Sequence, residues 1–444
     1  MPRRMPSNSR AGKTGPNHLL SRRGFLARGG AAAIGAAGSV VGQGCRREEE
    51  PEPIKVGILH SQTGTMAISE TSLRDMELFA IEEINAAGGV LGRMLEPVVK
   101  DTRSRFEDLF PKRARELLVE EHVDVVFGCW TSVSRKAVQP VFERHGGLLF
   151  YPLQYEGNEC SPNIVYTGSL PSQQVIPAVD WLRSLSGGAK RRFFIVGADY
   201  VFPWTLDHVI GAHLEATYPD TEIVGRVYRP FGHQDFEAVV GEIVASGADV
   251  VINAINGDSN LYFYNELARQ GVRASDIPVL ATSIGEDELR GLLPEVVEGH
   301  LAAWNYFQRI DTGRNRRFVE AFQLEHGEDR VVSDPMESAY AAVYLWKSAV
   351  ELAGSPDPNS VRAALARGIQ FDAPGGLVRV DPRNQHVTKR CRVGRIRSDR
   401  QFDIVYEAPR VLTPDPFPQD AFPGWRCDWT RGGLIEGAPV DVSP

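Results

Sequence analysis

The chain has 444 residues, 49 of them basic and 57 acidic, which gives a formal net charge of −8 at pH 7. An acidic chain without a basic stripe argues against nucleic acid as its partner. The length, about 400 residues once a leader is removed, favours two domains over a single hydrophobic core.

The first 45 residues indicate export. They carry seven Arg or Lys and no acidic residue, and Ser21-Arg-Arg-Gly-Phe-Leu26 resembles a twin-arginine signal. The apolar stretch 29–42 is too short for a membrane span, which needs about 20 apolar residues. We therefore expect an export signal over 1–45, a tether over 46–53, and a periplasmic or cell-surface location.

Cys45 is a candidate lipid-bearing residue because the small Gly44 precedes it. Gly42 and Gln43 fit a lipobox poorly, so a lipid anchor and plain cleavage both stay open. Loss of the leader leaves 42 basic and 57 acidic residues, a net charge near −15.

Four further cysteines can pair in three ways: Cys129, Cys160, Cys391 and Cys427. Cys391 with Cys427 is the expected pair because both lie in the C-terminal region. Cys129 ends an apolar run and is expected to be a buried thiol.

From residue 54 onward, strand and helix patterns alternate, which is typical of parallel sheets with crossover helices. The first series has strands 54–59, 97–100, 123–127 and 148–151, with helices 73–85, 107–121 and 134–144. The second has helices 173–184, 204–217, 236–245 and 260–270, with strands 192–196, 222–228, 249–254 and 279–281. Strand 300–304, helices 314–325 and 336–353, and strands 371–380, 390–396 and 402–407 follow.

This pattern predicts an α/β fold of two lobes with a small-molecule site between them. Residues 54–170 and 302–358 form the predicted first lobe, 171–301 and 359–408 the second, and 409–444 an extended C-terminal tail.

Polar and aromatic residues cluster where these strands end. The two most informative segments are 127–136 and 149–157, which end apolar runs in hydroxyl, amide and aromatic residues. Thr131, Ser132 and Ser134 can cap the following helix and direct its N–H groups at a ligand. Similar clusters occupy 61–70, 199–203, 256–258 and 283–286.

Signatures of catalysis and metal binding are missing from the sequence. It has no Gly-x-Ser-x-Gly, no His-Glu-x-x-His and no Cys-x-x-Cys. His60, His233 and His300 are isolated from one another in the sequence, and we expect them to be core or loop residues. We predict no catalytic residue, no metal and no cofactor.

These segments closely resemble the periplasmic substrate-binding proteins of ABC importers, branched-chain amino-acid type, and among them the urea- and short-amide-binding branch. The resemblance runs from about residue 54 to 430, in segments 64–70, 82–92, 128–136, 151–157, 199–203, 255–258 and 299–306. It implies a type I periplasmic binding protein, with two Rossmann-like lobes joined by three crossovers and closing through a hinge. Amide-binding relatives carry Tyr in place of Trp130 and Thr-Pro in place of Leu153-Gln154, so this resemblance favours urea.

Urea is planar and neutral, with four N–H donors and one carbonyl oxygen, so its site needs mostly acceptors and flat walls. Acceptors are expected from Glu70, Gln154, Asp258 and Glu286, a donor from Ser132, and walls from Trp130, Tyr151 and Tyr200. The full predicted ligand set is Glu70, Trp130, Thr131, Ser132, Tyr151, Gln154, Tyr155, Tyr200, Asp258, Ser283 and Glu286. Arg135 and Lys136, inside a predicted helix, are expected to face solvent or the other lobe.

The leading hypothesis is an exported, non-enzymatic protein that binds urea and delivers it to the permease subunits of an ABC importer. The alternatives are a short-amide or amino-acid binding protein, and a periplasmic sensor that partners a signalling protein. An amidase is disfavoured because no nucleophile and base pair is apparent.

Overall fold

The computed structural model describes residues 51–443. The twin-arginine motif and Cys45 lie outside the described residues. No helix within 51–443 is long and apolar enough to cross a membrane.

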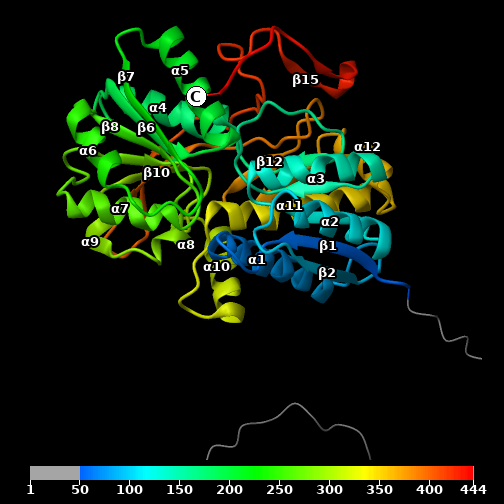
Figure 1. Ribbon diagram of the computed structural model, residues 1–444. Helices are drawn as coiled ribbons and strands as arrows, with labels where there is room; N and C mark the ends of the chain where they lie inside the picture. The colour runs from blue at the N-terminus through cyan, green and yellow to red at the C-terminus, as the bar shows by residue number, and fades with distance from the viewer. Residues whose placement is uncertain (1–50, 444) are drawn as a thin grey trace, which may run out of the picture. The chain divides into compact units, whose positions relative to one another are not determined.

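The first lobe is built on a parallel sheet with the strand order β2-β1-β3-β4-β5 (Figure 1). All neighbouring strands in it are parallel. Its strands are β1 (Ile54–His60), β2 (Leu95–Asp101), β3 (Val125–Gly128), β4 (Leu149–Tyr151) and β5 (Ile164–Tyr166).

The second lobe is built on a mixed sheet with the order β14-β13-β10-β9-β8-β6-β7. Strands β6 to β10 are parallel, whereas β13 and β14 are antiparallel. They are β6 (Arg192–Ala198), β7 (Glu222–Arg229), β8 (Val250–Ala254), β9 (Val279–Ala281), β10 (Leu301–Trp304), β13 (Arg392–Ile396) and β14 (Phe402–Glu407).

Helices cover both faces of each sheet. Those of the first lobe are α1 (Ala67–Ala86), α2 (Leu109–Arg115), α3 (Ser132–His145), α10 (Gly313–His326), α11 (Asp334–Ala353) and α12 (Pro358–Leu365). Those of the second are α4 (Val175–Arg183), α5 (Val201–Thr217), α6 (Glu237–Ser246), α7 (Ser259–Arg269), α8 (Glu286–Leu289) and α9 (Pro294–Val297). Two hairpins are also present: β11 (Gln370–Ala373) with β12 (Gly376–Arg379), and β15 (Arg426–Asp428) with β16 (Gly433–Ile435). A π-helix spans Glu116–Glu120, and short 3-10 helices span Pro171–Gln173 and Trp429–Arg431.

Alternation along the strands produces a core on each face of each sheet. In β1, Val56 and Ile58 pack on the face covered by α11, while Leu59 joins the cluster on the opposite face. In β6, Phe194 and Phe193 likewise point into different clusters. Successive side chains of a strand point to opposite faces, so a sheet covered on both sides needs apolar residues at nearly every position.

The chain passes between the lobes three times: after β5, after β10, and between β12 and β13. The predicted boundary at 359 is wrong, because α12 and the β11–β12 hairpin pack on the first lobe through Val361, Ala364 and Val378. Only the later part of 359–408, with β13 and β14, joins the second sheet. Both faces of the first sheet therefore need helices that follow the second lobe in sequence.

The predicted disulfide is also wrong. Cys427 in the C-terminal tail bonds to Cys160, with a Cα–Cα distance of 5.5 Å, whereas Cys391 is a free thiol in the core of the second lobe. Cys129 is free and buried, as expected. The same tail contacts α5 of the second lobe, where the His208 ring donates to the carbonyl of Ala421 at 3.0 Å.

Candidate functional site

A buried histidine and two carboxyls stand at the end of β1. The His60 Nε2 atom donates to the Glu77 carboxylate at 3.0 Å, and its Nδ1 lies 3.8 Å from Glu70 Oε2. Burial acts to lower the pKa of His60, but the Glu77 and Glu70 carboxylates outweigh it and raise that pKa to about 9. Glu70 accepts the backbone N–H of Ser61 with Oε2, while its Oε1 is buried without a hydrogen-bond partner within 51–443.

A second buried charge network is centred on Arg135 of α3. Arg135 donates to Glu156 at 2.9 Å and to Glu159 at 3.1 Å, and its guanidinium lies over the rings of Tyr151 and Tyr155 at 4.8 and 4.2 Å. The expectation that Arg135 faces solvent or the other lobe is wrong, since its side chain is fully buried within the first lobe.

The charges of this network stabilise each other. Burial acts to raise the pKa of Glu159, but Arg135 and Lys136 outweigh it and lower that pKa to about 2. The Tyr155 hydroxyl bonds to His386 and its ring stacks on Tyr166, so its polar atom is engaged inside the lobe.

The start of α3 follows the predicted capping pattern. The Thr131 hydroxyl accepts the backbone N–H of Ser134 at 3.1 Å, as an N-cap does. Ser132 donates to Glu156, and the Tyr151 hydroxyl donates to the carbonyl of Trp130 at 2.6 Å. Trp130 is only 5% exposed.

Three predicted positions of the second lobe form a chain of hydrogen bonds. The Tyr200 hydroxyl donates to Asn256 at 2.9 Å, and Asn256 donates to the Ser283 hydroxyl at 3.0 Å. Asp258, at the start of α7, is half-buried and takes no part in this chain.

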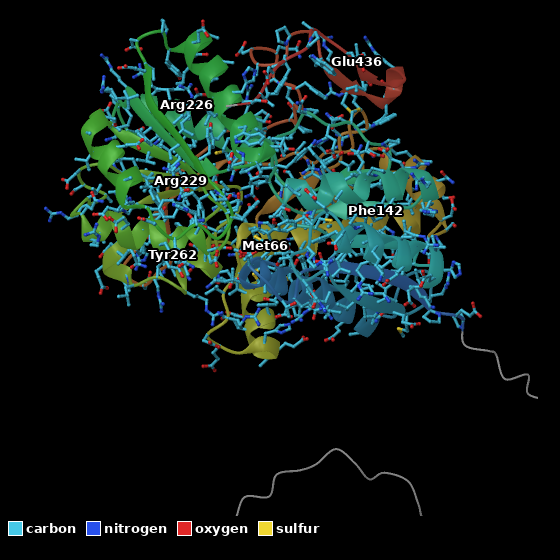
Figure 2. The ribbon with its side chains drawn as sticks, viewed as in Figure 1. Met66, Phe142, Arg226, Arg229, Tyr262 and Glu436 are labelled. Carbon is cyan, nitrogen blue, oxygen red and sulfur yellow. A yellow bond between two sulfur atoms is a disulfide. The ribbon has the colours of Figure 1, made fainter. Side chains whose placement is uncertain are left out.

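Two side-chain hydrogen bonds connect the lobes near these residues. The Gln154 amide donates to the Thr282 carbonyl at 3.2 Å and to the Ser283 hydroxyl at 3.0 Å, crossing from the first lobe to the second. The Ser69 hydroxyl donates to Glu288 at 2.8 Å in the same direction. The residue Met66, labelled in Figure 2, is buried opposite Gly257, where an added Cβ would lie 3.4 Å from its sulfur.

Glu286 lies between these two interlobe contacts, at the first position of α8. Its Oε1 accepts the backbone N–H of Gln308 at 2.7 Å, while its Oε2 is buried without a partner in the described part of the chain. Burial, with the nearby Asp334 and Glu288 carboxyls, raises the pKa of Glu286 to about 8. We call Glu70, Gln154, Ser283 and Glu286 the interlobe site.

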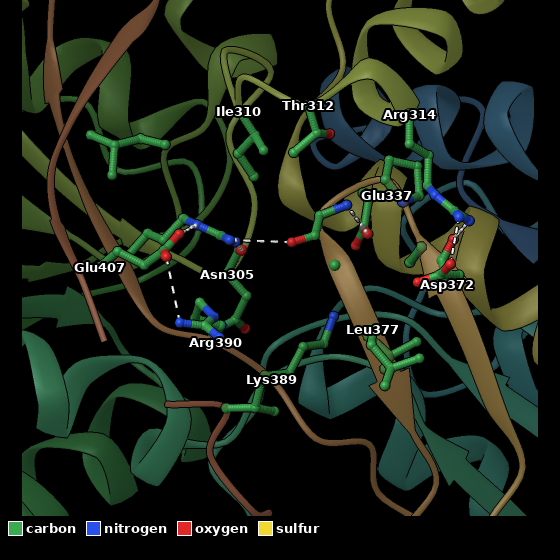
Figure 3. Close-up of a pocket in the computed structure, with 18 of the residues that line it drawn as sticks. Asn305, Ile310, Thr312, Arg314, Glu337, Asp372, Leu377, Lys389, Arg390 and Glu407 are labelled. Carbon is green, nitrogen blue, oxygen red and sulfur yellow. Dashed lines mark hydrogen bonds and ion pairs between the residues drawn. The ribbon is translucent and has the colours of Figure 1, made fainter. Parts of the chain in front are cut away.

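A separate cavity of about 610 Å³ lies at the hinge, between the crossover segments (Figure 3). It is lined by residues of both lobes, but by none of the predicted ligand residues. Its charged groups bond to one another or to neighbouring groups: Arg392 to Glu407 at 2.6 Å, Arg314 to Asp372, and Lys389 to the Ser338 hydroxyl at 2.7 Å. These bonds account for the charges without a ligand.

The structure therefore groups the predicted residues unevenly. Gln154 and Ser283 bond to each other across the lobe boundary, and Tyr200 joins Ser283 through Asn256. Glu286 lies between Ser283 and Glu288 in sequence, and Glu70 directly follows Ser69, which bonds to Glu288. Thr131, Ser132, Tyr151 and Tyr155 have structural bonds inside the first lobe, and Asp258 stands apart. Glu77, Ser69 and Glu288 were missed, although Glu288 lies only two residues beyond a predicted one.

Comparison with known proteins agrees with this architecture. Residues 54–422 match the family model described as periplasmic binding protein domain. The Leu/Ile/Val-binding protein homolog 6 of Brucella melitensis is 23% identical over 344 residues, covering 76% of this chain and 85% of the relative. The leucine-, isoleucine-, valine-, threonine-, and alanine-binding protein of Pseudomonas aeruginosa is 25% identical, covering 74% and 86%.

Solved structures share the fold. A solute-binding protein of an ABC transporter from Rhodopseudomonas palustris, in complex with 3,4-dihydroxybenzoic acid, superposes with a TM-score of 0.73 at 20% identity, covering 82% of this chain and 99% of that one. The branched-chain amino acid transporter substrate-binding protein of Streptococcus pneumoniae, in complex with isoleucine, gives 0.67 at 18% identity, covering 82% and 100%.

The matched region spans both lobes and all three crossovers. The chain belongs to the periplasmic binding protein family, with the type I fold of ABC-transporter solute-binding proteins of the branched-chain amino-acid type.

Proposed function

We propose that this protein captures urea, or a closely similar small amide, and delivers it to an ABC importer without chemical change. The main support for this proposal is that three buried oxygen atoms of the interlobe site have no hydrogen-bond partner within 51–443. They are Glu70 Oε1 and Gln154 Oε1 on the first lobe and Glu286 Oε2 on the second.

The cost of leaving these atoms unpaired supports a small ligand with several hydrogen-bonding groups. A buried polar group without a partner costs about 1–3 kcal/mol, so a molecule that bonds to all three is strongly favoured. Urea supplies four N–H groups in one plane and is small enough for lobes that already touch through Gln154 and Ser69. We expect Trp130 and Tyr200, which are 5% and 7% exposed, to supply aromatic surface from the two lobes.

The surrounding charges also support a ligand without a carboxylate. Carboxylate recognition generally uses Arg or a comparable cation. Arg135, the buried cation of this region, already bonds to two carboxylates of its own lobe.

An amino acid is the second candidate, because the relatives reported above are named for leucine, isoleucine and valine. Its ammonium group would bond to the Glu70 or Glu286 carboxyl, and its carboxylate to the N–H groups at the start of α3. This candidate needs donors from the α3 backbone, whereas urea uses the three unpaired oxygens directly.

Isothermal titration calorimetry of the purified protein with urea, acetamide, leucine and glutamate tests the proposal. We expect saturable urea binding, weakened about tenfold to a hundredfold by Gln154→Ala, which removes one acceptor. Asp258→Ala is the control, because Asp258 stands outside the interlobe site and its loss should leave urea affinity unchanged. Heat with leucine and none with urea or acetamide would replace the urea assignment with the amino-acid one.

A further inference from the structure

The two carboxyls of the interlobe site have opposite surroundings. Glu70 lies beside the His60 ring, which also bonds to Glu77. Glu286 forms no ion pair with any Lys, Arg or His in the part of the chain that the structure describes. Its charged neighbours are the acidic Asp334 of α11 and Glu288 of α8, with the Tyr306 hydroxyl the other titratable group nearby.

A carboxylate in this position would be poorly stabilised. Glu286 is 1% exposed, and burying an unpaired ion costs so much that such groups take up a proton instead. The pKa of about 8, raised first by burial and then by Asp334 and Glu288, agrees with a side chain that is mostly the neutral acid at pH 7.

The hydrogen bond from Gln308 shows which oxygen carries the proton. Oε1 accepts that backbone N–H at 2.7 Å and must therefore offer a lone pair. The proton then belongs on Oε2, the oxygen that has no partner within 51–443. A protonated carboxyl has one O–H donor, so Oε2 is a donor where the sequence predicts an acceptor.

Glu286 lies in a segment that contacts the first lobe. Ser283 on one side of it bonds to Gln154, and Glu288 on the other side bonds to Ser69, so the segment between them faces the first lobe. Building on the proposed function, we infer that Glu286 donates its carboxylic proton to the carbonyl oxygen of the ligand, while Glu70 and Gln154 accept the ligand N–H groups.

This division of roles predicts selection against guanidinium. Guanidinium has the planar shape of urea but carries an N–H group where urea has its oxygen, so its N–H would meet the O–H of Glu286, donor against donor. Specificity often comes from such a mismatch rather than from an added attraction. Once Glu286 is ionised, its oxygen repels the urea oxygen and attracts guanidinium.

Calorimetric titrations of urea and guanidinium chloride between pH 6.5 and 9 test the inference. Urea affinity should stay level to about pH 7.5 and then fall about tenfold by pH 9, because each pH unit above the pKa removes about nine-tenths of the binding form. Guanidinium should bind weakly at pH 6.5 and at least tenfold tighter at pH 9.

Glu286→Gln is the conservative variant. In this variant the amide oxygen accepts the backbone N–H of Gln308, so the NH₂ group takes the position of Oε2 and still donates a hydrogen bond. At pH 6.5 the variant should bind urea with an affinity within about threefold of that of the unmodified protein. Above pH 8 its urea affinity should no longer fall. Glu288→Gln is the control for the neighbouring carboxyl, because burial raises the pKa of Glu288 to about 7. In this variant urea affinity should still fall above pH 8.

The outcomes separate this inference from the proposed function. Urea affinity that is flat or rises up to pH 9, or a Gln variant that keeps the decline, would overturn the role of Glu286 and leave urea binding intact. No binding of urea, acetamide or formamide at any pH would overturn both.

Discussion

At the scale of single residues, the buried His60 ties protein stability to pH. Its pKa is raised from 6.5 to about 9 in the folded protein, so the folded state holds the proton more tightly than the unfolded chain. The resulting stabilisation, on the order of 3 kcal/mol, is fully present below pH 6.5 and is lost between pH 6.5 and 9.

Thermal unfolding followed by circular dichroism, without urea or guanidinium in the buffer, checks this at pH 6, 7.5 and 9. We expect the difference in unfolding free energy between the unmodified protein and His60→Gln to shrink as the pH rises. A difference that stays constant from pH 6 to 9 would mean that folding does not shift the pKa of His60.

Arg135 and Lys136 offer a matched pair on α3. Arg135→Met leaves Glu156 and Glu159 buried without their main cation, which should lower the unfolding free energy by about 3–5 kcal/mol. Lys136→Met removes a side chain that is 39% exposed and should cost less than about 1 kcal/mol. Equal costs in thermal or denaturant unfolding would contradict the buried network.

At the scale of elements, the N-cap of α3 links local structure to the site. Thr131→Ala removes the acceptor for the Ser134 N–H and should lower the unfolding free energy by about 1 kcal/mol, whereas Thr131→Ser keeps the hydroxyl and should cost little. Denaturant unfolding measures both. Ligand affinity should fall in the Ala variant only, because Ser132 and Trp130 lie at the same helix end.

Regular elements with long apolar patterns were predictable from sequence. Strand β9 was predicted with its observed bounds, and α10 and α11 within two residues, because period-2 and period-3.6 patterns report burial directly. Strand β5 and helix α12 were not predicted. They owe their structure to packing on the first lobe, which no local pattern reveals.

Contacts between residues far apart in the sequence were harder to predict. Arg135 was expected outside because a charged residue on a helix usually is, and its partners lie 21 and 24 residues away on another segment. The disulfide partner of Cys427 depends on the path of the tail, which passes Cys160 rather than Cys391. Strand-end clustering did select Gln154 and Ser283, which the structure brings into contact, since parallel strands bring their carboxyl ends to one edge.

At the scale of the whole described chain, the disulfide-bonded tail connects the lobes. Cys160 belongs to the first lobe, and the tail also packs on α5 through Phe422 and Val209. Cys427→Ser should lower the unfolding free energy by about 2–4 kcal/mol and speed ligand release, because the lobes then separate more freely. Stopped-flow release and denaturant unfolding measure the two effects.

Reduction provides the control for this variant. Dithiothreitol should shift the unmodified protein toward the behaviour of Cys427→Ser and leave the variant itself unchanged, because Cys129 and Cys391 are already free thiols. Identical release rates before and after reduction would show that the tail does not restrain the lobes.

The three passages between the lobes have a consequence for biosynthesis. When the ribosome has made β1 to β5, one face of that sheet still awaits α11, which follows the whole of β6 to β10. The second sheet in turn awaits β13 and β14. Neither lobe can finish folding during translation until most of the chain has emerged, so a nascent chain stalled before residue 334, where α11 begins, exposes apolar surface in both lobes at once.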